Sequence, residues 1–478
     1  MRSFRFIFFL LTLGLALYAR ALPVNVLATG DMHGWLEAQQ VNGQTLGGAA
    51  EMLAYWKRVE GYAPERFLLL GCGDTATGPA LSTVFQNDPV IAVMNLMGYD
   101  ACALGNHEFD YGLASLERWR KDATFPFLAG NLVKADGAPA DLPPFVINDE
   151  QGVKVAVIGL ITSDVAAIAG TGWHRATPYA AALRKWVPEA RAQGAQVVIV
   201  AAHIPLEPLM QLARQVADLK IPLMLGGHNH ELGQMKVGDT WVVGTGEWWK
   251  SYSRINLDYN PQTGSTVVLA ANQVWLQQQN APADPAVKAE IDRWKARMDE
   301  GFNKPVGYTA AGIRRPVGIY NFIIDCWLAQ DQTADIALSN IGGFRQNIAP
   351  GAVTKSTIIG VMPFTNSLLR MAVTGNRLLA FLPKDGNIGM AGLRFAGGQY
   401  VVLKTGQPID PAATYRVLIN DYFFNGSAVL KAADPAPVIV CADWRQFVFD
   451  WLAAHPTDKD RPLEGLLDLK SRWDAPAK

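Results

Sequence analysis

The sequence predicts an α/β fold for the first part of this 478-residue chain and a second, α+β domain for the rest. Two observations carry this prediction. Short apolar runs alternate with helical patterns through residue 230, as is typical of strands and helices packed in layers. A charged, helix-favouring stretch at 285–298 then separates two globular-looking parts. A length prior of roughly 150 residues per domain also favours more than one domain.

Residues 1–21 have the layout of a secretory signal peptide. Arg2 and Arg5 form a basic start, an apolar run covers 6–18, and Ala19 and Ala21 are the small residues before a cleavage point. The apolar run is shorter than the roughly 20 residues of a membrane-spanning helix. We therefore expect a protein without a membrane anchor, periplasmic or secreted after cleavage near Ala21.

Residues 22–284 are predicted to form the first domain. Its continuous apolar runs are typical of strands that are covered on both faces. They are VNVLAT (24–29), RFLLLG (66–71), VKVAVIGL (153–160), QVVIVAA (196–202) and IPLMLGG (221–227). Between them, Asp88-Pro89 and Thr177-Pro178 indicate capped helix starts, and Gly98 and Gly194 indicate the ends. From 239 to 277 the pattern changes to strands without helices.

A connecting helix is expected next, because residues 285–298 favour a helix but show no long apolar face. This predicts a linker at 285–307 and a second domain at 308–478, which ends in a helix within DWRQFVFDWLAAH (443–455). The net charge of -1 gives no reason to expect nucleic-acid binding. Four cysteines in so long a chain do not indicate a disulfide framework.

The histidines are the main chemical signal. Of the seven, five fall in the blocks GDMHG (30–34), GNHEFD (105–110), AAHIP (201–205) and GGHNH (226–230), and GCGD (71–74) ends a strand with an aspartate. Side chains at the carboxyl ends of strands converge in open α/β sheets. The candidate ligands are Asp31, His33, Asp74, Asn106, His203, His228 and His230. They are too many for one ion, so two divalent ions that share a carboxylate are expected, and N/O ligands suit Mn, Zn or Fe.

These blocks, in this order, resemble the calcineurin-like metallophosphoesterases and, more narrowly, the exported 5'-nucleotidase family. The stretch MNLMGYDACALGNHEFDYG (94–112) is the most specific, and the likeness continues in DIALSNIGGFRQNIAPGAVT (335–354) and VMPFTNSLLRMAVTG (361–375). The resemblance implies a four-layer α/β/β/α sandwich followed by a 5'-nucleotidase-like C-terminal domain that binds substrate and swings about the linker helix.

The resemblance also implies a role for each site residue. Asp31, His33 and His230 would hold one metal, Asn106, His203 and His228 the other, and Asp74 would bridge them. His107 would face the substrate, with Asp110 orienting its ring. In the second domain, Arg315 and Arg345 match phosphate-side arginines, Asn340 matches a polar contact, and Phe364 and Tyr422 match two aromatic residues that enclose the base. Two departures from the family pattern stand out. Ile341 replaces a glycine, which predicts that the phosphate side of the substrate pocket is narrower. Ala428 stands where the family has an acidic residue that contacts the ribose.

The expected function is therefore an exported dinuclear-metal phosphohydrolase acting on nucleoside 5'-monophosphates or related nucleotides. Two cations lower the pKa of a bound water, and the hydroxide that results would attack phosphorus. The alternatives with the same fold are a 2',3'-cyclic nucleotide phosphodiesterase, a nucleotide-sugar hydrolase and a sulfur-oxidation enzyme of the SoxB type. A non-catalytic exported binding protein is the alternative from another class, and it would not need all seven ligands together with His107 and Asp110.

Overall fold

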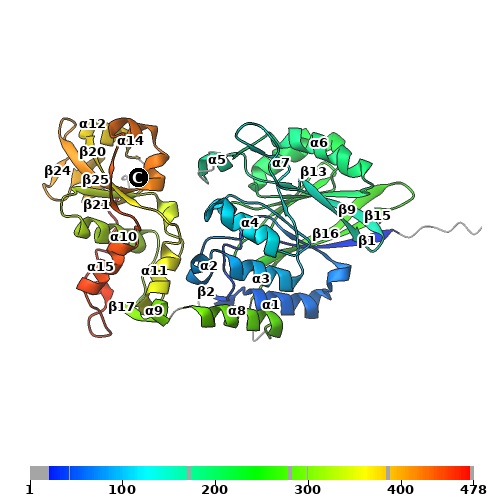
Figure 1. Ribbon diagram of the computed structural model, residues 1–478, viewed down its shortest axis with the longest axis horizontal. Helices are drawn as coiled ribbons and strands as arrows, with labels where there is room; N and C mark the ends of the chain where they lie inside the picture. Colours follow the sequence, from blue (N-terminus) through cyan, green and yellow to red (C-terminus); the bar gives the residue numbers. More distant parts are fainter. Residues whose placement is uncertain are drawn as a thin grey trace, which may run out of the picture.

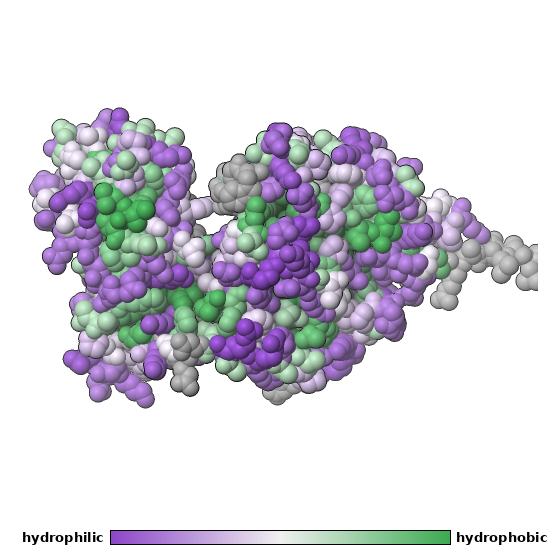
Figure 2. Space-filling view, viewed as in Figure 1, coloured by the Kyte–Doolittle hydropathy of each residue, from purple (hydrophilic) through white to green (hydrophobic). Residues whose placement is uncertain are grey.

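A computed structural model describes residues 21–41, 44–168, 174–277, 282–298, 300–383 and 388–473. The signal peptide that the sequence predicts lies outside these residues, apart from Ala21. Two bodies lie side by side, the first drawn in blue to green and the second in yellow to red (Figure 1). Figure 2 shows an indentation between them in the upper part of the view, whereas they join in the lower part. There, α2 (Ala80–Val84) of the first body contacts α11 (Lys355–Val361) of the second.

The first body contains two six-stranded sheets that pack face to face. One sheet has the strand order β16-β15-β1-β4-β5-β6 and the other β13-β14-β12-β11-β9-β8. The strands of the first sheet are β1 (Leu22–Thr29), β4 (Leu68–Gly71), β5 (Ala101–Ala103), β6 (Phe127–Leu128), β15 (Ser251–Asn260) and β16 (Ser265–Trp275). Those of the second are β8 (Phe145–Glu150), β9 (Val153–Leu160), β11 (Val197–Ala202), β12 (Leu223–Gly226), β13 (Gln234–Val237) and β14 (Thr240–Gly244). Apolar side chains from both sheets, such as Val26 and Ile199, form one buried cluster between them.

Helices cover the outer face of each sheet, which completes the four layers that the resemblance implies (Figure 1). On one side lie α1 (Ala49–Tyr55), α3 (Asp88–Met97) and α4 (Gly112–Asp122), and on the other α6 (Tyr179–Ala192) and α7 (Leu206–Gln215). Smaller elements are α5 (Val165–Ile168) and the strand pairs β2 (Gln39–Val41) with β3 (Gln44–Leu46) and β7 (Leu132–Lys134) with β10 (His174–Ala176). The predicted cap at Asp88 is wrong: Asp88 lies in the first turn of α3 and accepts a hydrogen bond from Arg118 Nε (3.0 Å).

The expected connecting helix is α8 (Pro285–Arg297), and it packs on α1 and α3. Asp284 caps it by accepting hydrogen bonds from the Ala286 and Val287 backbone N–H groups (3.1 and 3.2 Å). Val287, Ile291 and Trp294 are buried against the first body. Their spacing of four and three residues forms a narrow apolar stripe, although the sequence shows no long apolar face. The domain limits at 284 and 307 stay predictions.

The second body is built on a five-stranded sheet of order β21-β18-β25-β20-β26. Its strands are β18 (Ile336–Ser339), β20 (Leu368–Thr374), β21 (Gly389–Ala391), β25 (Thr414–Asn420) and β26 (Val438–Cys441). The helices are α9 (Glu300–Asn303), α10 (Val317–Gln330), α11, α12 (Gly375–Phe381), α13 (Asp421–Asn425), α14 (Ala428–Ala433) and α15 (Gln446–Ala454). Smaller strands are β17 (Pro305–Thr309), β19 (Gly351–Thr354), β22 (Leu393–Ala396), β23 (Gln399–Val402) and β24 (Gln407–Pro408). Helix α15 confirms the predicted final helix.

None of the helices within the described ranges is long and apolar enough to cross a membrane. All four cysteines are free thiols, and three of them are buried.

Candidate metal centre and substrate cavity

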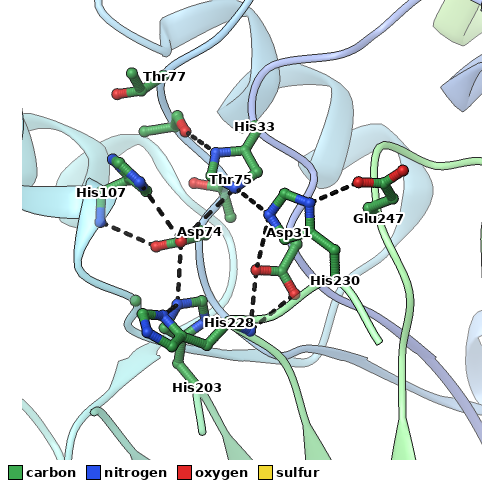
Figure 3. A network of polar contacts seen from close by, with 12 residues as sticks. Asp31, His33, Asp74, Thr75, Thr77, His107, His203, His228, His230 and Glu247 are labelled. Atoms are coloured by element: carbon green, nitrogen blue, oxygen red, sulfur yellow. Dashed lines mark hydrogen bonds and ion pairs between the residues drawn. The ribbon is translucent and has the colours of Figure 1, made fainter. Parts of the chain in front are cut away.

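The seven predicted ligands gather where parallel strands of the two sheets end. Asp31 and His33 follow β1, Asp74 follows β4 and Asn106 follows β5 in the first sheet. His203 follows β11, and the GGHNH block follows its parallel neighbour β12, in the second sheet. Because both sheets present their carboxyl ends to the same space, side chains from five strands meet there (Figure 3).

Tight backbone turns aim these side chains. Five of the seven candidates have left-handed backbone conformations although none is glycine: Asp31 (φ 51°), His33 (φ 45°), Asp74 (φ 50°), His228 (φ 83°) and His230 (φ 60°). Such residues are uncommon, and each costs of order 1–3 kcal/mol unless its surroundings hold it. A Cβ atom on Gly105 would lie 2.1 Å from Asp74 Oδ1, so only glycine fits before Asn106.

One group of ligand atoms comes from Asp31, His33 and His230. His33 Nε2 lies 3.0 Å from His230 Nε2, and His230 Nε2 lies 3.8 Å from Asp31 Oδ1. A second group comes from Asp74, His203 and His228. His203 Nε2 lies 3.0 Å from both Asp74 Oδ2 and His228 Nδ1. Asp74 Oδ2 also lies 3.7 Å from His33 Nε2, so this carboxylate stands between the two groups.

The donor set fits divalent cations. His33 Nδ1 donates to the Ala76 carbonyl oxygen (3.2 Å) and His203 Nδ1 to that of Cys72 (2.9 Å). Both Nε2 atoms then present lone pairs to other acceptors, an arrangement that is repulsive unless a cation or a proton lies between them. The buried Asn106 Oδ1 has no hydrogen-bond partner, and an amide oxygen of this kind can complete a metal site.

Without metal, protons take the place of the cations. Burial lowers the pKa of His203, but the Asp74 carboxylate outweighs this effect, and the net result raises that pKa to about 10. Burial raises the pKa of Asp31 to about 7. Burial would also raise the pKa of Asp74, yet the neighbouring imidazoles hold it well below its usual range. Binding of a cation therefore displaces at least the His203 proton.

Two carboxylates that the sequence patterns did not single out support the ligands. Glu108 is buried and accepts hydrogen bonds from the backbone N–H groups of Asp74 (3.0 Å), Thr75 (2.6 Å) and Gly105 (2.6 Å). Glu247 accepts a hydrogen bond from His230 Nδ1 (2.6 Å) (Figure 3). Glu247 follows β14, which is parallel to β12, so the same strand-end rule that found the ligands could have found it.

His107 stands beside the two groups. Its Nε2 lies 3.9 Å from Asp74 Oδ2, and its Nδ1 lies 2.6 Å from Asp110 Oδ2, which also accepts a hydrogen bond from Thr77 Oγ1 (2.6 Å). Burial alone would lower the pKa of His107, but the carboxylates of Asp110 and Asp74 outweigh it and raise that pKa. The predicted pairing of His107 with Asp110 is therefore present in the structure.

A cavity of about 360 Å³ lies between the two bodies and opens onto this centre. Its lining includes His107 and Asp110 from the first body and, from the second, four predicted substrate contacts: Asn340, Arg345, Phe364 and Tyr422. Phe364 faces His107 with a ring separation of 5.8 Å, and Tyr422 is 47% exposed. The remaining predicted contact, Arg315, lines a second cavity of about 460 Å³.

Arg345 connects the two bodies at the centre itself. Its Nη2 lies 3.4 Å from His33 Nε2, and it lines both cavities. The second cavity is also lined by Asp74, His107, Glu247 and Trp248. The two arginines therefore present positive charge to the space in front of the metal ligands.

Neither of the two residues at which the sequence departs from the family is itself a lining residue of the cavities. Ile341 lines neither cavity, so the structure gives no support to the expected narrowing of the phosphate side. Ala428 is the first residue of α14, whose N-cap Ser427 accepts a hydrogen bond from the Leu430 backbone N–H (3.2 Å). It lines neither cavity, and the position contributes no carboxylate to them.

Comparisons with known proteins agree with this architecture. Residues 24–232 match the model of the calcineurin-like phosphoesterases, and residues 304–434 match that of the 5'-nucleotidase C-terminal domain. Protein UshA of Yersinia enterocolitica is 25% identical over 87% of this chain and 88% of its own length. Endonuclease YhcR of Bacillus subtilis is 25% identical over 84% of this chain, which spans only 37% of that relative.

Among solved structures, a 5'-nucleotidase precursor from Thermus thermophilus has the same fold. Its TM-score is 0.82 at 24% identity, and the match covers 95% of this chain and 99% of that one. The two family models match in the order in which the structure places the four-layer body and the smaller sheet domain. This chain therefore belongs to the calcineurin-like phosphoesterases that carry a 5'-nucleotidase C-terminal domain.

Proposed function

We propose that this protein is an exported dinuclear-metal phosphohydrolase that releases phosphate from nucleoside 5'-monophosphates or related nucleotides. One observation carries the proposal: an aromatic cavity lined by Arg345 opens onto two groups of ligands, and the Asp74 carboxylate of one lies 3.7 Å from His33 of the other. Aromatic faces suit a base, guanidinium groups suit phosphate, and a shared carboxylate suits two ions.

Two divalent ions, Mn, Zn or Fe, would be held by the seven ligands. Asp31, His33 and His230 would hold one ion, Asn106, His203 and His228 the other, and Asp74 would bridge them. When bound, such ions neutralise phosphate oxygens and activate water at neutral pH.

The protein's own residues would do the rest. Arg345 and Arg315 would grip phosphate oxygens, because a guanidinium offers paired donors in the geometry that phosphate accepts. His107 would give its Nε2 proton to the departing ester oxygen, and Asp110 would hold the ring by its Nδ1 proton. Phe364 and Tyr422 would contact the base on its faces, which gives affinity with little base preference.

A related substrate is the second candidate, and Ala428 favours it. With no carboxylate at this position, ribose hydroxyls lose an expected partner. The second cavity also continues from Arg345 to Arg315, Glu247 and Trp248, which leaves room for a substituent beyond the phosphate. A nucleotide sugar carries such a substituent, and a 2',3'-cyclic nucleotide has no free 2' and 3' hydroxyls that would need the missing carboxylate. A sulfur-oxidation enzyme of the SoxB type is the remaining alternative with this fold.

Export belongs to the proposal, and it rests on the N-terminal sequence alone. A processed chain that begins at Leu22 in the exported fraction would support it. An N-terminus at Met1 in all fractions would refute it.

The decisive experiment measures phosphate release from AMP by protein that begins at Leu22, after EDTA treatment and after Mn²⁺ or Zn²⁺ is restored. Release that requires metal supports the proposal. No release from AMP, cyclic nucleotides or UDP-sugars, with metal-dependent cleavage of bis-p-nitrophenyl phosphate, refutes the nucleotide assignment and keeps the metal site. The His107→Ala variant tests the binding-protein alternative, because an enzyme loses about 10²-fold or more in turnover.

A further inference from the structure

The turn Glu247–Lys250 contacts two members of one ligand group. It follows β14, and its Glu247 carboxylate accepts a hydrogen bond from His230 Nδ1 (2.6 Å) (Figure 3). The Trp248 backbone N–H donates to the Asp31 carbonyl oxygen (2.9 Å). The turn thus reaches the side chain of one candidate ligand and the backbone of another, and both belong to the Asp31–His33–His230 group.

His230 differs from other candidate ligands in its outer partner. His33 and His203 donate their Nδ1 protons to backbone carbonyl oxygens, whereas His230 donates to a carboxylate. A carboxylate behind a ligating histidine fixes its tautomer and orientation and raises its basicity more than a neutral acceptor does. The two ligand groups are therefore supported in chemically different ways.

Lys250, which is buried, completes an ion pair with Glu247 behind His230. Its Nζ lies 3.1 Å from Glu247 Oε1, and the residue is only 6% exposed. The same Nζ lies 3.8 Å from the centre of the Trp248 ring, which stacks on Trp35 at a centroid distance of 5.2 Å. Glu247 thus uses one carboxylate oxygen for His230 and the other for Lys250, and the lysine offsets the charge placed behind the ligand.

The turn is held in a strained shape. Trp248 and Trp249 both have left-handed conformations (φ 55° and 48°), and the Lys250 backbone N–H donates to the Glu247 carbonyl oxygen (2.9 Å). Trp249 is buried, and its Nε1 donates to Tyr99 Oη (3.2 Å). Two adjacent non-glycine residues in this region require firm support, and strain of this kind gathers at functional sites.

We propose that Glu247, held by Lys250, is a positioning residue that sets the metal affinity of the Asp31–His33–His230 group separately from that of the Asp74–His203–His228 group. The inference rests on the proposed dinuclear site and adds an asymmetry to it. Loss of an outer partner of this type weakens metal binding by about 10- to 100-fold. Only one of two ions is affected, because His230, the ligand that Glu247 contacts, belongs to the first group. In the second group, the Cys72 carbonyl lies behind His203, and Glu108 accepts a hydrogen bond from the Asp74 backbone N–H.

The experiment titrates Zn²⁺ or Mn²⁺ into metal-free protein against a competing chelator and resolves two binding steps. The variants are Glu247→Ala, Glu247→Gln and Lys250→Met. The matched control is Glu231→Gln: Glu231 is adjacent to His230 in sequence and exposed, and its carboxylate accepts a hydrogen bond from the Leu206 backbone N–H (3.2 Å). Thermal unfolding of each metal-free variant measures any loss of stability.

The expected result is that Glu247→Ala weakens one step by about 10- to 100-fold and leaves the other step unchanged. Glu247→Gln, which keeps an acceptor of the same size, weakens the same step less, and so does Lys250→Met. If Glu247→Ala fails to fold, Glu247→Gln decides. Two unchanged steps, equal weakening of both, or an equal effect of Glu231→Gln overturns the inference and leaves the proposed function standing. A wild-type protein that binds no metal overturns both.

Discussion

Replacing Asp110 by asparagine tests whether the carboxylate acts through His107. The change keeps the size of the side chain but removes the charge from a 2.6 Å contact with His107 Nδ1. A hydrogen bond to a charged group contributes about 1.5–3 kcal/mol, and each 1.36 kcal/mol corresponds to a tenfold change in rate. Turnover at pH 7 is therefore expected to fall about 10- to 100-fold.

The pH profile gives a second, independent readout. Asp110 and Asp74 raise the pKa of His107 above its usual value in spite of burial. If the protonated ring is the active form, activity falls as the pH rises through this pKa. Without the Asp110 charge the pKa is lower, so the fall in kcat should begin at a lower pH.

The assay is metal-saturated turnover from pH 5 to 10 for Asp110→Asn, His107→Ala and the double variant. Asp110→Asn should cost little in the His107→Ala background. An equal cost in both backgrounds, or an unmoved alkaline limb, would refute the reasoning. Thr77→Val is the control, because it removes the hydrogen bond from Thr77 Oγ1 to Asp110 (2.6 Å) but keeps the Asp110 charge beside His107, so the alkaline limb should not move to lower pH.

Three further outcomes are expected. Phe364→Ala should raise KM for AMP about 10- to 100-fold, because stacking on a base contributes about 1–3 kcal/mol. Cleavage of bis-p-nitrophenyl phosphate should change by no more than a few-fold, and an equal loss on both substrates would contradict a role in base binding. Metal binding should release about one proton near pH 7, since the pKa of His203 is about 10 without metal, and metal affinity should therefore weaken as the pH falls. Calorimetry in buffers of different ionisation enthalpy measures the proton release, and identical heats in all buffers would exclude it. Glu150→Gln should stabilise the fold by about 1–2 kcal/mol at pH 8, after allowance for solvent screening, and by nothing at pH 4. Burial raises the pKa of Glu150 to about 7, so its contribution to stability is fully present below the unfolded value and is lost as the pH rises through 7; urea unfolding at both pH values measures the difference, and a pH-independent effect would exclude this cause.

The sequence was informative where function depends on residues next to a strand. Asp31, Asp74 and His203 were found because each directly follows an apolar run, and parallel strands bring such positions to one edge. The proline and glycine signals at the ends of α3 and α6 also located these helices to within a few residues. These features depend on neighbouring residues in the sequence and not on contacts between distant segments.

Features that depend on tertiary contacts escaped. The cap assigned to Asp88 failed because the side chain pairs with Arg118, which is distant in sequence. The sequence shows no long apolar face on α8, because three buried positions are enough to pack this helix against α1 and α3. The role of Glu247 depends on its contact with His230, which only the folded structure shows.

The left-handed backbone conformations of the ligand residues link the metal chemistry of this protein to the stability of its fold. At Asp31, His33 and Asp74 a glycine would relax the backbone, so variants that abandon the metals could be more robust than the active protein. Selection for thermal stability alone would therefore favour the loss of these metal ligands. Stabilising substitutions should therefore be placed in the helices outside the sheets and not in these turns, because a gain in stability in those helices does not cost activity.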